Sequence, residues 1–474
     1  MVEPDVGFHD NTTSAIASWA ASVRRADIPE STVRALVGHH LDTVACAVGA
    51  MSFPPAVATR DIACESPTDR GVSVLGAINK VAPEAGIFAN TAMVRYLDLN
   101  DNYFRLGGGH TSDLIPALWA AAELTGASGA ALVEGLHVGY EVHMALADAV
   151  DLRDRGWDYP AFISIATAAA TSRMLGLSVD QTAHALAMTI TGTSAPLGSS
   201  RVGELGNWKA LASSHAVMNG FIAARLASRG VTGPSRVIEG HRGFQHLVTG
   251  PFSLEHLGRP RDGFTAGERS AYKLHVADFN TQTVVQEFVE LHRQGVRPDD
   301  IDSVTIAVPW VTWSECGGGQ DDHDEKWDPK TKETADHSIP YVASVALVDG
   351  FVQKESYLPE RYLDPALRPI MAKIEVVADA EITKTWVEKP TNVITLRLKS
   401  GEVRAIRTDY PRGHHLNPVE ERELVTKFEY QCRSLVSSEI AERLLATLQK
   451  LDSLDTLGEM FADMRSLEMK VETQ

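Results

Sequence analysis

A short polar segment between residues 96 and 113 holds side chains that could transfer protons or bind a carboxylate. It contains a carboxylate, an amide, an imidazole and a hydroxyl, on Asp98, Asn102, His110 and Ser112. The glycines at 107–109 break any helix inside the segment, and glycine lets backbone approach a ligand closely. An apolar run at 114–122 then predicts a buried helix. A polar loop anchored to a buried helix favours a small-molecule site; the alternative is a helix cap beside an acidic, solvated turn.

His110 is the strongest single candidate for proton transfer, because the ordinary pKa of imidazole lies near neutrality. Asp98 could orient this histidine, deprotonate it, or act directly. Lys209 stands at the head of a mostly apolar helix. A lysine there could bind a carboxylate or lose its proton and act as a base. The alternative is a surface lysine whose stem packs on apolar neighbours.

The charge balance limits the possible partners. The chain has 474 residues and a formal net charge of −18, so nucleic acid and anionic membranes are improbable partners. A site for an anionic substrate must therefore supply positive charge locally. The four cysteines are scattered, no basic and apolar leader opens the chain, and no apolar run is long enough for a membrane span. We expect a protein of the reducing cytoplasm, without disulfides.

The hydrophobic pattern predicts a mainly α protein made of a large all-helical domain and a smaller α+β lid. Alanine-rich helices are expected at 130–149, 162–176 and 211–229, where small side chains allow close packing. Alternating strand patterns follow only after about residue 260, at 304–308, 374–377, 393–398 and 403–406. The last two flank residues 399–402, a plausible hairpin turn. The helical pattern returns after Pro411.

These changes predict that the lid is inserted into the helical domain. The expected parts are the helical domain at 1–265, the lid at 266–410, and the C-terminal return of the helical domain at 411–474. Helices rich in alanine and glycine also offer faces suited to close packing between subunits. We expect a homodimer formed mainly by the helical domain, with the lids free to move.

Several motifs, in order along nearly the whole chain, resemble those of the MmgE/PrpD family. They are the Asp98–Asp101 and His110–Ser112 motifs, the alanine-rich helix pair at 162–188, the segment from Lys209 to Phe244, the lysine region at Lys273, the Thr334–Tyr341 run "TADHSIPY", and Tyr410–His414. The family contains 2-methylcitrate dehydratases, cis-aconitate decarboxylases and iminodisuccinate epimerases. Its fold, a helical domain with an α+β lid, agrees with the pattern above.

The resemblance implies a set of site residues. The catalytic candidates are Asp98, His110, Lys209, Lys273 and Tyr159. The candidates for substrate binding are Asn102, Ser112, His275 and Tyr341. We expect Asp98 and His110 to converge with the two lysines and Tyr341 on one cleft between the helical domain and the lid.

Two departures from the family pattern bear on this set. Tyr159 or Asp158 stands where the family usually has a histidine, and the segment from Lys273 to Val276 lacks the usual Tyr-Pro pair. His275 could compensate for the missing histidine.

No cofactor or metal is expected. No phosphate-binding glycine motif is present, and a functional metal in the acidic loop Asp322–Asp324 is improbable. The expected activity is that of a cofactor-independent hydro-lyase. It would dehydrate 2-methylcitrate, as in propionate catabolism, or a similar tricarboxylate to an aconitate-type product. The alternatives are a decarboxylase of cis-aconitate or an epimerase, and, in another class, a catalytically silent ligand-binding or scaffold relative.

Overall fold

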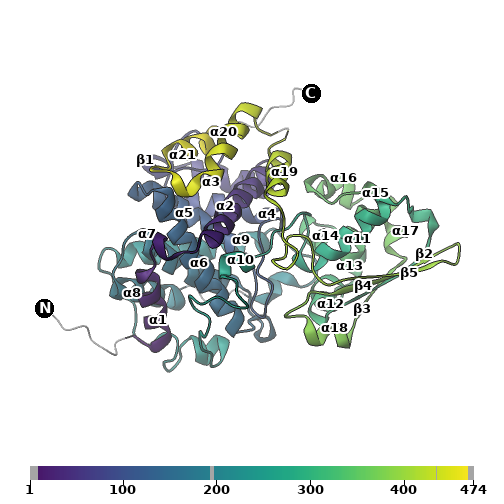
Figure 1. Ribbon diagram of the computed structural model, residues 1–474, viewed down its shortest axis with the longest axis horizontal. Helices are drawn as coiled ribbons and strands as arrows, with labels where there is room; N and C mark the ends of the chain where they lie inside the picture. Colours follow the sequence, from purple (N-terminus) through teal and green to yellow (C-terminus); the bar gives the residue numbers. More distant parts are fainter. Residues whose placement is uncertain (1–8, 193–196, 434, 468–474) are drawn as a thin grey trace.

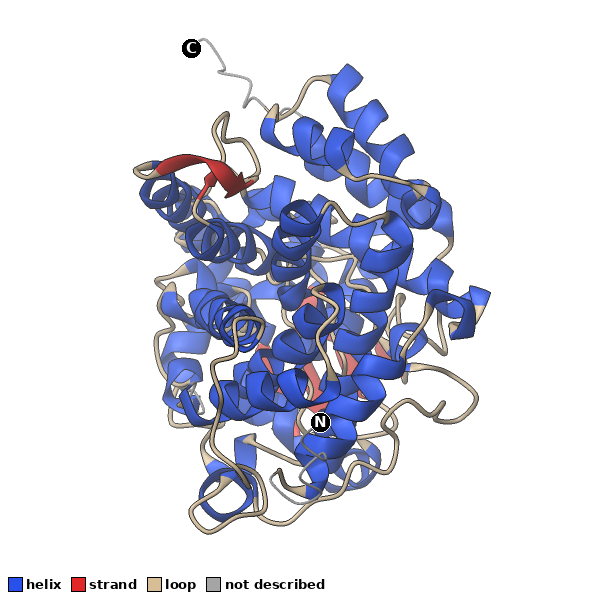
Figure 2. Ribbon diagram, turned by 90° about the vertical axis from the view of Figure 1, so that its left-hand side faces the viewer, coloured by secondary structure: helices blue, strands red, loops and turns tan. Residues whose placement is uncertain are grey.

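The computed structural model describes residues 9–192, 197–433 and 435–467. Most of the described chain is helical, and the expected mainly α architecture is confirmed. Among the described residues, ten α-helices come before the lid: α1 (Asn11–Ser22), α2 (Glu30–Ala50), α3 (Pro54–Cys64), α4 (Pro83–Tyr96), α5 (Ile115–Thr125), α6 (Gly129–Ala149), α7 (Pro160–Met174), α8 (Val179–Gly192), α9 (Trp208–Ala227) and α10 (Ala266–Arg269). The short strand β1 (Pro67–Val72) lies among them. Figure 2 shows these helices in front, with β1 apart at the upper edge.

The lid, used here for the elements from α11 to β5, contains a four-stranded mixed sheet. Its helices are α11 (Gln282–Arg293), α12 (Trp310–Cys316), α13 (His323–Trp327), α14 (Lys332–Ala335), α15 (Ile339–Asp349), α16 (Pro359–Tyr362), α17 (Arg368–Met371) and α18 (Ala380–Thr385). Its strands are β2 (Ile301–Val308), β3 (Ile374–Ala378), β4 (Asn392–Leu398) and β5 (Val403–Thr408), in the order β3-β2-β4-β5. β2 pairs with β3 in parallel and with β4 antiparallel, and β4 and β5 form the expected hairpin.

In the described part of the chain after the lid, three α-helices follow: α19 (Glu421–Cys432), α20 (Ser438–Gln449) and α21 (Gly458–Arg465). They return to the N-terminal helices, where α19 and α20 pack against α2 (Figure 1). α10 also packs there, against α2 and α6. We call α1–α10 together with α19–α21 the helical part. The exact domain boundaries at 265 and 410 stay a prediction.

The alanine-rich helices form the centre of the helical part. α7 packs against both α6 and α9, and nearly all of its side chains are buried. At Gly220, an added Cβ would stand 2.5 Å from the carbonyl oxygen of Ser164, so α9 approaches α7 too closely for any larger residue. Within the described residues, no single helix is long and apolar enough to cross a membrane; α2 and α3 meet that test only as a pair, bent by 96°.

Candidate active site

Asp98 is the centre of a buried cluster of charges. It follows α4 with φ +53°, a left-handed conformation that aspartate tolerates better than most residues. The Lys209 ammonium on α9 donates to its carboxylate at 2.6 Å, and Arg95 on α4 approaches it at 3.1 Å. The Lys273 ammonium contacts both the carboxylate and the carbonyl oxygen of Asp98. Three cations from three segments therefore surround one carboxylate.

These neighbours decide the charge states. Burial by itself favours the neutral acid, but Arg95, Lys209 and Lys273 hold the pKa of Asp98 well below its usual range. Burial also lowers the pKa of Lys209, an effect that Asp98 and Asp336 oppose. Two further carboxylates, Asp336 and Asp278, lie near the same cations, so much of the positive charge in the cluster is balanced.

His110 is placed as a proton acceptor. Its Nδ1 lies 2.8 Å from the carbonyl oxygen of Asp101. A carbonyl can only accept, so Nδ1 holds the proton and Nε2 keeps a lone pair. Burial, together with Arg95 and Lys273, moves the pKa of His110 well below its usual value. The imidazole is therefore neutral near pH 7, and its Nε2 lies 3.6 Å from Oδ1 of Asp98, which would stabilise the imidazolium after proton uptake.

A second imidazole, His337, reaches the cluster from the lid. Its Nδ1 contacts the carboxylate of Asp336 and lies 3.3 Å from the Lys209 ammonium. Its Nε2 lies 3.4 Å from Oδ2 of Asp278 and 3.7 Å from Oδ2 of Asp98. Sequence reasoning missed this residue, although it lies in the Thr334–Tyr341 run. The run itself could have indicated His337 as a site residue, but Tyr341 was predicted to be its site residue instead.

Tyr159 joins the cluster through its hydroxyl. The hydroxyl donates to Oδ2 of Asp113 at 2.7 Å and accepts from Nε of Arg95 at 3.1 Å. Burial raises the pKa of Asp113 to about 6, against the effect of Arg95 and the hydrogen bonds to that carboxylate. Asp158, the other residue at the position of the family's histidine, instead pairs with Arg201 at 2.9 Å.

The expectation that Tyr341 reaches the cleft is wrong. Ser338 caps α15 and accepts from the backbone N–H of Tyr341, which directs the tyrosine into the lid core. There its hydroxyl donates to the carbonyl oxygen of Ser356, and its ring packs near Tyr357. The other residues expected to converge do so: Lys209, Lys273 and His110 all lie against Asp98.

The remaining candidates lie at the margin of the cluster. Asn102 is buried and lines the small cavity described next. The Ser112 hydroxyl accepts from the amide of Asn100, so it serves the loop. His275 donates its backbone N–H to Gln282 on α11, and its role in place of the missing histidine stays a prediction. The substrate-binding roles of Asn102 and Ser112 stay predictions.

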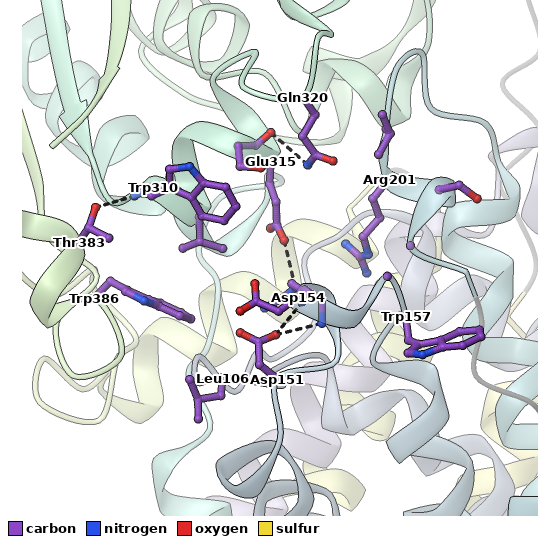
Figure 3. Close-up of a pocket in the computed structure, with 17 residues that line it drawn as sticks. Leu106, Asp151, Asp154, Trp157, Arg201, Trp310, Glu315, Gln320, Thr383 and Trp386 are labelled. Carbon is purple, nitrogen blue, oxygen red and sulfur yellow. Dashed lines mark hydrogen bonds and ion pairs between the residues drawn. The ribbon is translucent and has the colours of Figure 1, made fainter. Parts of the chain in front are cut away.

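Two adjoining cavities lie beside the cluster, and the larger of them is lined by both the helical part and the lid. The inner one, about 10 Å³, is lined by His110, Tyr159, Asn102 and Asp278, and has room for about one water. The outer one, about 560 Å³, opens beside it (Figure 3). Two arginines, Arg153 and Arg201, line both cavities.

Some clusters also have the residue types of metal ligands. Asp98, Asp336 and His337 offer ligand atoms within 4.8 Å of one another, but the Lys209 ammonium approaches both carboxylates and would repel a cation. In the acidic loop, Asp322 is buried and pairs with Lys326 at 3.3 Å. Outside the site, the ligand atoms of His9, Asp180 and His184 are similarly close.

Comparison with known proteins gives matches along most of the chain. The MmgE/PrpD N-terminal domain matches residues 14–257, and the MmgE/PrpD C-terminal domain matches residues 275–453. The cis-aconitate decarboxylase-like protein oryM of Aspergillus oryzae is 23% identical over 98% of this chain and 99% of its own. The mitochondrial 2-methylcitrate dehydratase of Yarrowia lipolytica is 26% identical over 86% of this chain and 81% of its own. The cis-aconitate decarboxylase of Mus musculus is 23% identical over 79% of this chain and 77% of its own length.

Proposed function

The chain belongs to the MmgE/PrpD family, and from this premise we propose that it is a hydro-lyase that dehydrates 2-methylcitrate or a similar hydroxy-polycarboxylate. The observation that best supports the proposal is the state of His110. Its proton is held on Nδ1 by the carbonyl of Asp101, which leaves a lone pair on Nε2, and the residue lines the inner cavity. A neutral imidazole with a free lone pair is the group that removes a proton next to a carboxylate.

The proposed elimination uses the surrounding charges in turn. Nε2 of His110 takes the proton from the carbon beside a substrate carboxylate, and Asp98 stabilises the imidazolium that forms. The charge that develops on the substrate carboxylate is stabilised by cations already fixed in place, such as Lys273 and Arg201. The carbon–oxygen bond then breaks, and the leaving hydroxyl takes a proton from Lys209. A buried ammonium with a lowered pKa is a better donor than an exposed one.

A cis-aconitate-type decarboxylase is the second candidate. The alignment with the decarboxylase-like protein oryM, which extends over 98% of this chain, favours it. Decarboxylation needs a proton delivered to carbon beside carboxylates, so the same residues could serve. An epimerase needs the same groups. A silent relative is disfavoured, because two imidazoles, His110 and His337, and the Lys209 ammonium gather around Asp98.

One assay separates dehydration from decarboxylation. The purified protein is incubated with 2-methylcitrate, citrate and cis-aconitate, with absorbance read at ~240 nm for the aconitate-type double bond and carbon dioxide measured in parallel. Dehydration gives rising absorbance without carbon dioxide, whereas decarboxylation gives carbon dioxide. His110→Ala should lower kcat by about 10²-fold or more, and the exposed His241→Ala is the matched control. Absence of turnover on all three acids would contradict the proposal.

A further inference from the structure

Buried lysines hold the backbone around Asp98, at residues 96–99, which we call the Asp98 turn. Three of them donate to its carbonyl oxygens: Lys332 to that of Tyr96, Lys273 to that of Asp98, and Lys427 to that of Leu99. The three lysines come from three different segments of the chain. Buried backbone carbonyls need a hydrogen-bond partner, and here it is supplied by side chains far away in sequence.

Lys427, on α19, connects this turn to Lys273. Its ammonium donates to the carbonyl oxygen of Leu99 at 2.9 Å and to that of Lys273 at 2.8 Å. Asp42 on α2 balances its charge at 2.5 Å. Burial by itself would lower the pKa of Lys427, but Asp42 holds that pKa above its usual value, so the ammonium stays charged. One side chain therefore joins the residue after Asp98 to the backbone of Lys273.

The backbone conformation of Asp98 explains why the turn needs this support. Its φ of +53° lies in the left-handed region, which costs free energy for a residue other than glycine and persists where the surroundings enforce it. Its carboxylate has to accept from Lys209 and also lie 3.6 Å from Nε2 of His110. A small rotation of the turn would change both contacts. Misplacement of a reacting group by about 1 Å can cost 10²-fold in rate.

We infer that Lys427 is a positioning residue, which together with Asp42 holds the Asp98 turn and Lys273 in the arrangement that the reaction needs. This inference rests on the proposed function, because the proposed reaction uses Asp98 and Lys273. Lys427 lies outside the lining of both cavities, so it acts through these two residues and not on a substrate. α19 lies at the side of the helical part that meets the lid (Figure 1). The C-terminal return of the chain thereby completes the site.

The first test separates positioning from stability. Lys427→Met leaves Asp42 buried without its cation, so it should lower both kcat and the melting temperature. The double variant Asp42→Asn/Lys427→Met removes the unpaired charge as well. We expect its melting temperature to recover in part, while kcat stays about 10-fold to 100-fold below that of the unmodified protein. Recovery of kcat along with the melting temperature would overturn the inference.

Lys354→Met is the matched control. Lys354 is also a buried lysine, and its ammonium donates to a backbone carbonyl of the same helix, that of Gln431, at 3.2 Å. Its removal leaves the contacts of Lys427 in place. Lys354→Met should therefore lower the melting temperature and keep kcat. A loss of kcat as large as in Lys427→Met would show that any weakening around α19 has the same effect, and would overturn the inference.

A measurement without substrate distinguishes this inference from the proposed function. In protein with isotope-labelled histidine, the nuclear magnetic resonance signal of the His110 imidazole is identified by its loss in His110→Ala. The signal should shift in Lys427→Met and in the double variant, because Asp98 and Lys273 act on this ring. It should stay unchanged in Lys354→Met. A shift without turnover in the unmodified protein would keep the positioning role and remove the proposed reaction. An unchanged signal in both Lys427 variants would overturn the positioning role whatever the turnover.

Discussion

Lys209 shows how a strongly acidic chain keeps a positive charge in its interior. The ammonium is almost fully buried, yet its charge is balanced by Asp98 at 2.6 Å and Asp336 at 3.9 Å. Removing one partner from a buried ion pair leaves the other charge uncompensated, which costs about 3–5 kcal/mol. A substitution here therefore changes stability as well as kinetics.

Lys209→Met tests this residue. Losing a charge-assisted contact costs roughly 1.5–3 kcal/mol, so kcat/KM should fall about 10-fold to 150-fold. The melting temperature should fall too, because Asp98 loses one of its cations. Enzyme kinetics and thermal unfolding measure the two effects, and the exposed Lys330→Met is the control. Unchanged kinetics in both Lys209→Met and Lys273→Met would remove the lysines from the mechanism.

The pH dependence of activity tests His110. A base acts only when deprotonated, so kcat/KM should fall as the pH drops through the pKa of this imidazole. Burial and the neighbouring cations place that pKa well below 6.5. The acidic limb of the pH profile should therefore have its midpoint below pH 6.5. The measurement is a series of kcat/KM values between about pH 5 and 8 in buffers of constant ionic strength. A midpoint at or above 6.5 would contradict the assigned state of His110.

At the scale of elements, features that depend on neighbouring residues were predicted well from the sequence, whereas packing between distant segments was not. The β4–β5 hairpin and the strands β2 and β3 follow from alternation and turn residues, which are local. The glycines at 107–109 do interrupt helical structure as predicted, but the reason for glycine at position 109 differs from the predicted approach to a ligand. A Cβ at Gly109 would stand 2.2 Å from the Tyr159 ring, so this glycine makes room for a side chain fifty positions away rather than for a ligand. Contacts between distant segments cannot be inferred from one sequence.

Gly109→Ala should therefore disturb Tyr159. The added methyl would push the ring away from Asp113 and Arg95, costing about 1–3 kcal/mol of unfolding free energy and lowering kcat. Chemical denaturation and the turnover assay measure both effects. Gly458→Ala, at a position with nothing within 4 Å, is the control and should be neutral or slightly stabilising. Full activity in Gly109→Ala would show that the position of Tyr159 is unimportant.

In the Thr334–Tyr341 run, too, the orientation of the side chains could not be inferred from the sequence. Sequence pattern indicated that the run belongs to the active site, but helical geometry decides which of its side chains faces Asp98. Because Ser338 begins α15, His337 stays outside the helix and points to the cluster, whereas Tyr341 turns into the lid. In the charge cluster, Asp98, His110, Lys209 and Lys273 were predicted, whereas His337 and Asp336 were passed over within the run and Arg95 and Asp278, as single charged residues, had no pattern of their own.

Tyr341→Phe and His337→Gln should accordingly differ. Tyr341→Phe leaves the carbonyl of Ser356 without its donor and should lower the unfolding free energy by about 1–3 kcal/mol, with kcat/KM nearly unchanged. His337→Gln should lower kcat/KM by about 10-fold or more. Parallel measurement of thermal unfolding and turnover in the two variants decides the matter. A large loss of activity in Tyr341→Phe alone would restore that tyrosine to the site.

At the scale of the whole molecule, the small-residue helices are used within one chain. The glycines and alanines of α7 and α9 allow these two helices to meet each other, so they do not by themselves offer a dimer interface. We still propose a homodimer formed by the helical part, because exposed apolar side chains remain there, among them Trp208 and Leu247. One chain has a mass of 51.4 kDa, and small-angle scattering at micromolar concentration should give twice that mass. A monomer would contradict this.

The inner cavity of about 10 Å³ has a consequence for the kinetics of inhibition. A tricarboxylate is larger than this space, so under the proposed function the structure has to open beside His110 before such a substrate binds, and again before it leaves. Release of a ligand that satisfies the buried cations would therefore wait for this opening. Residence time on this protein would then be governed by the opening rate, and a modest inhibitor could remain bound far longer than its equilibrium affinity suggests.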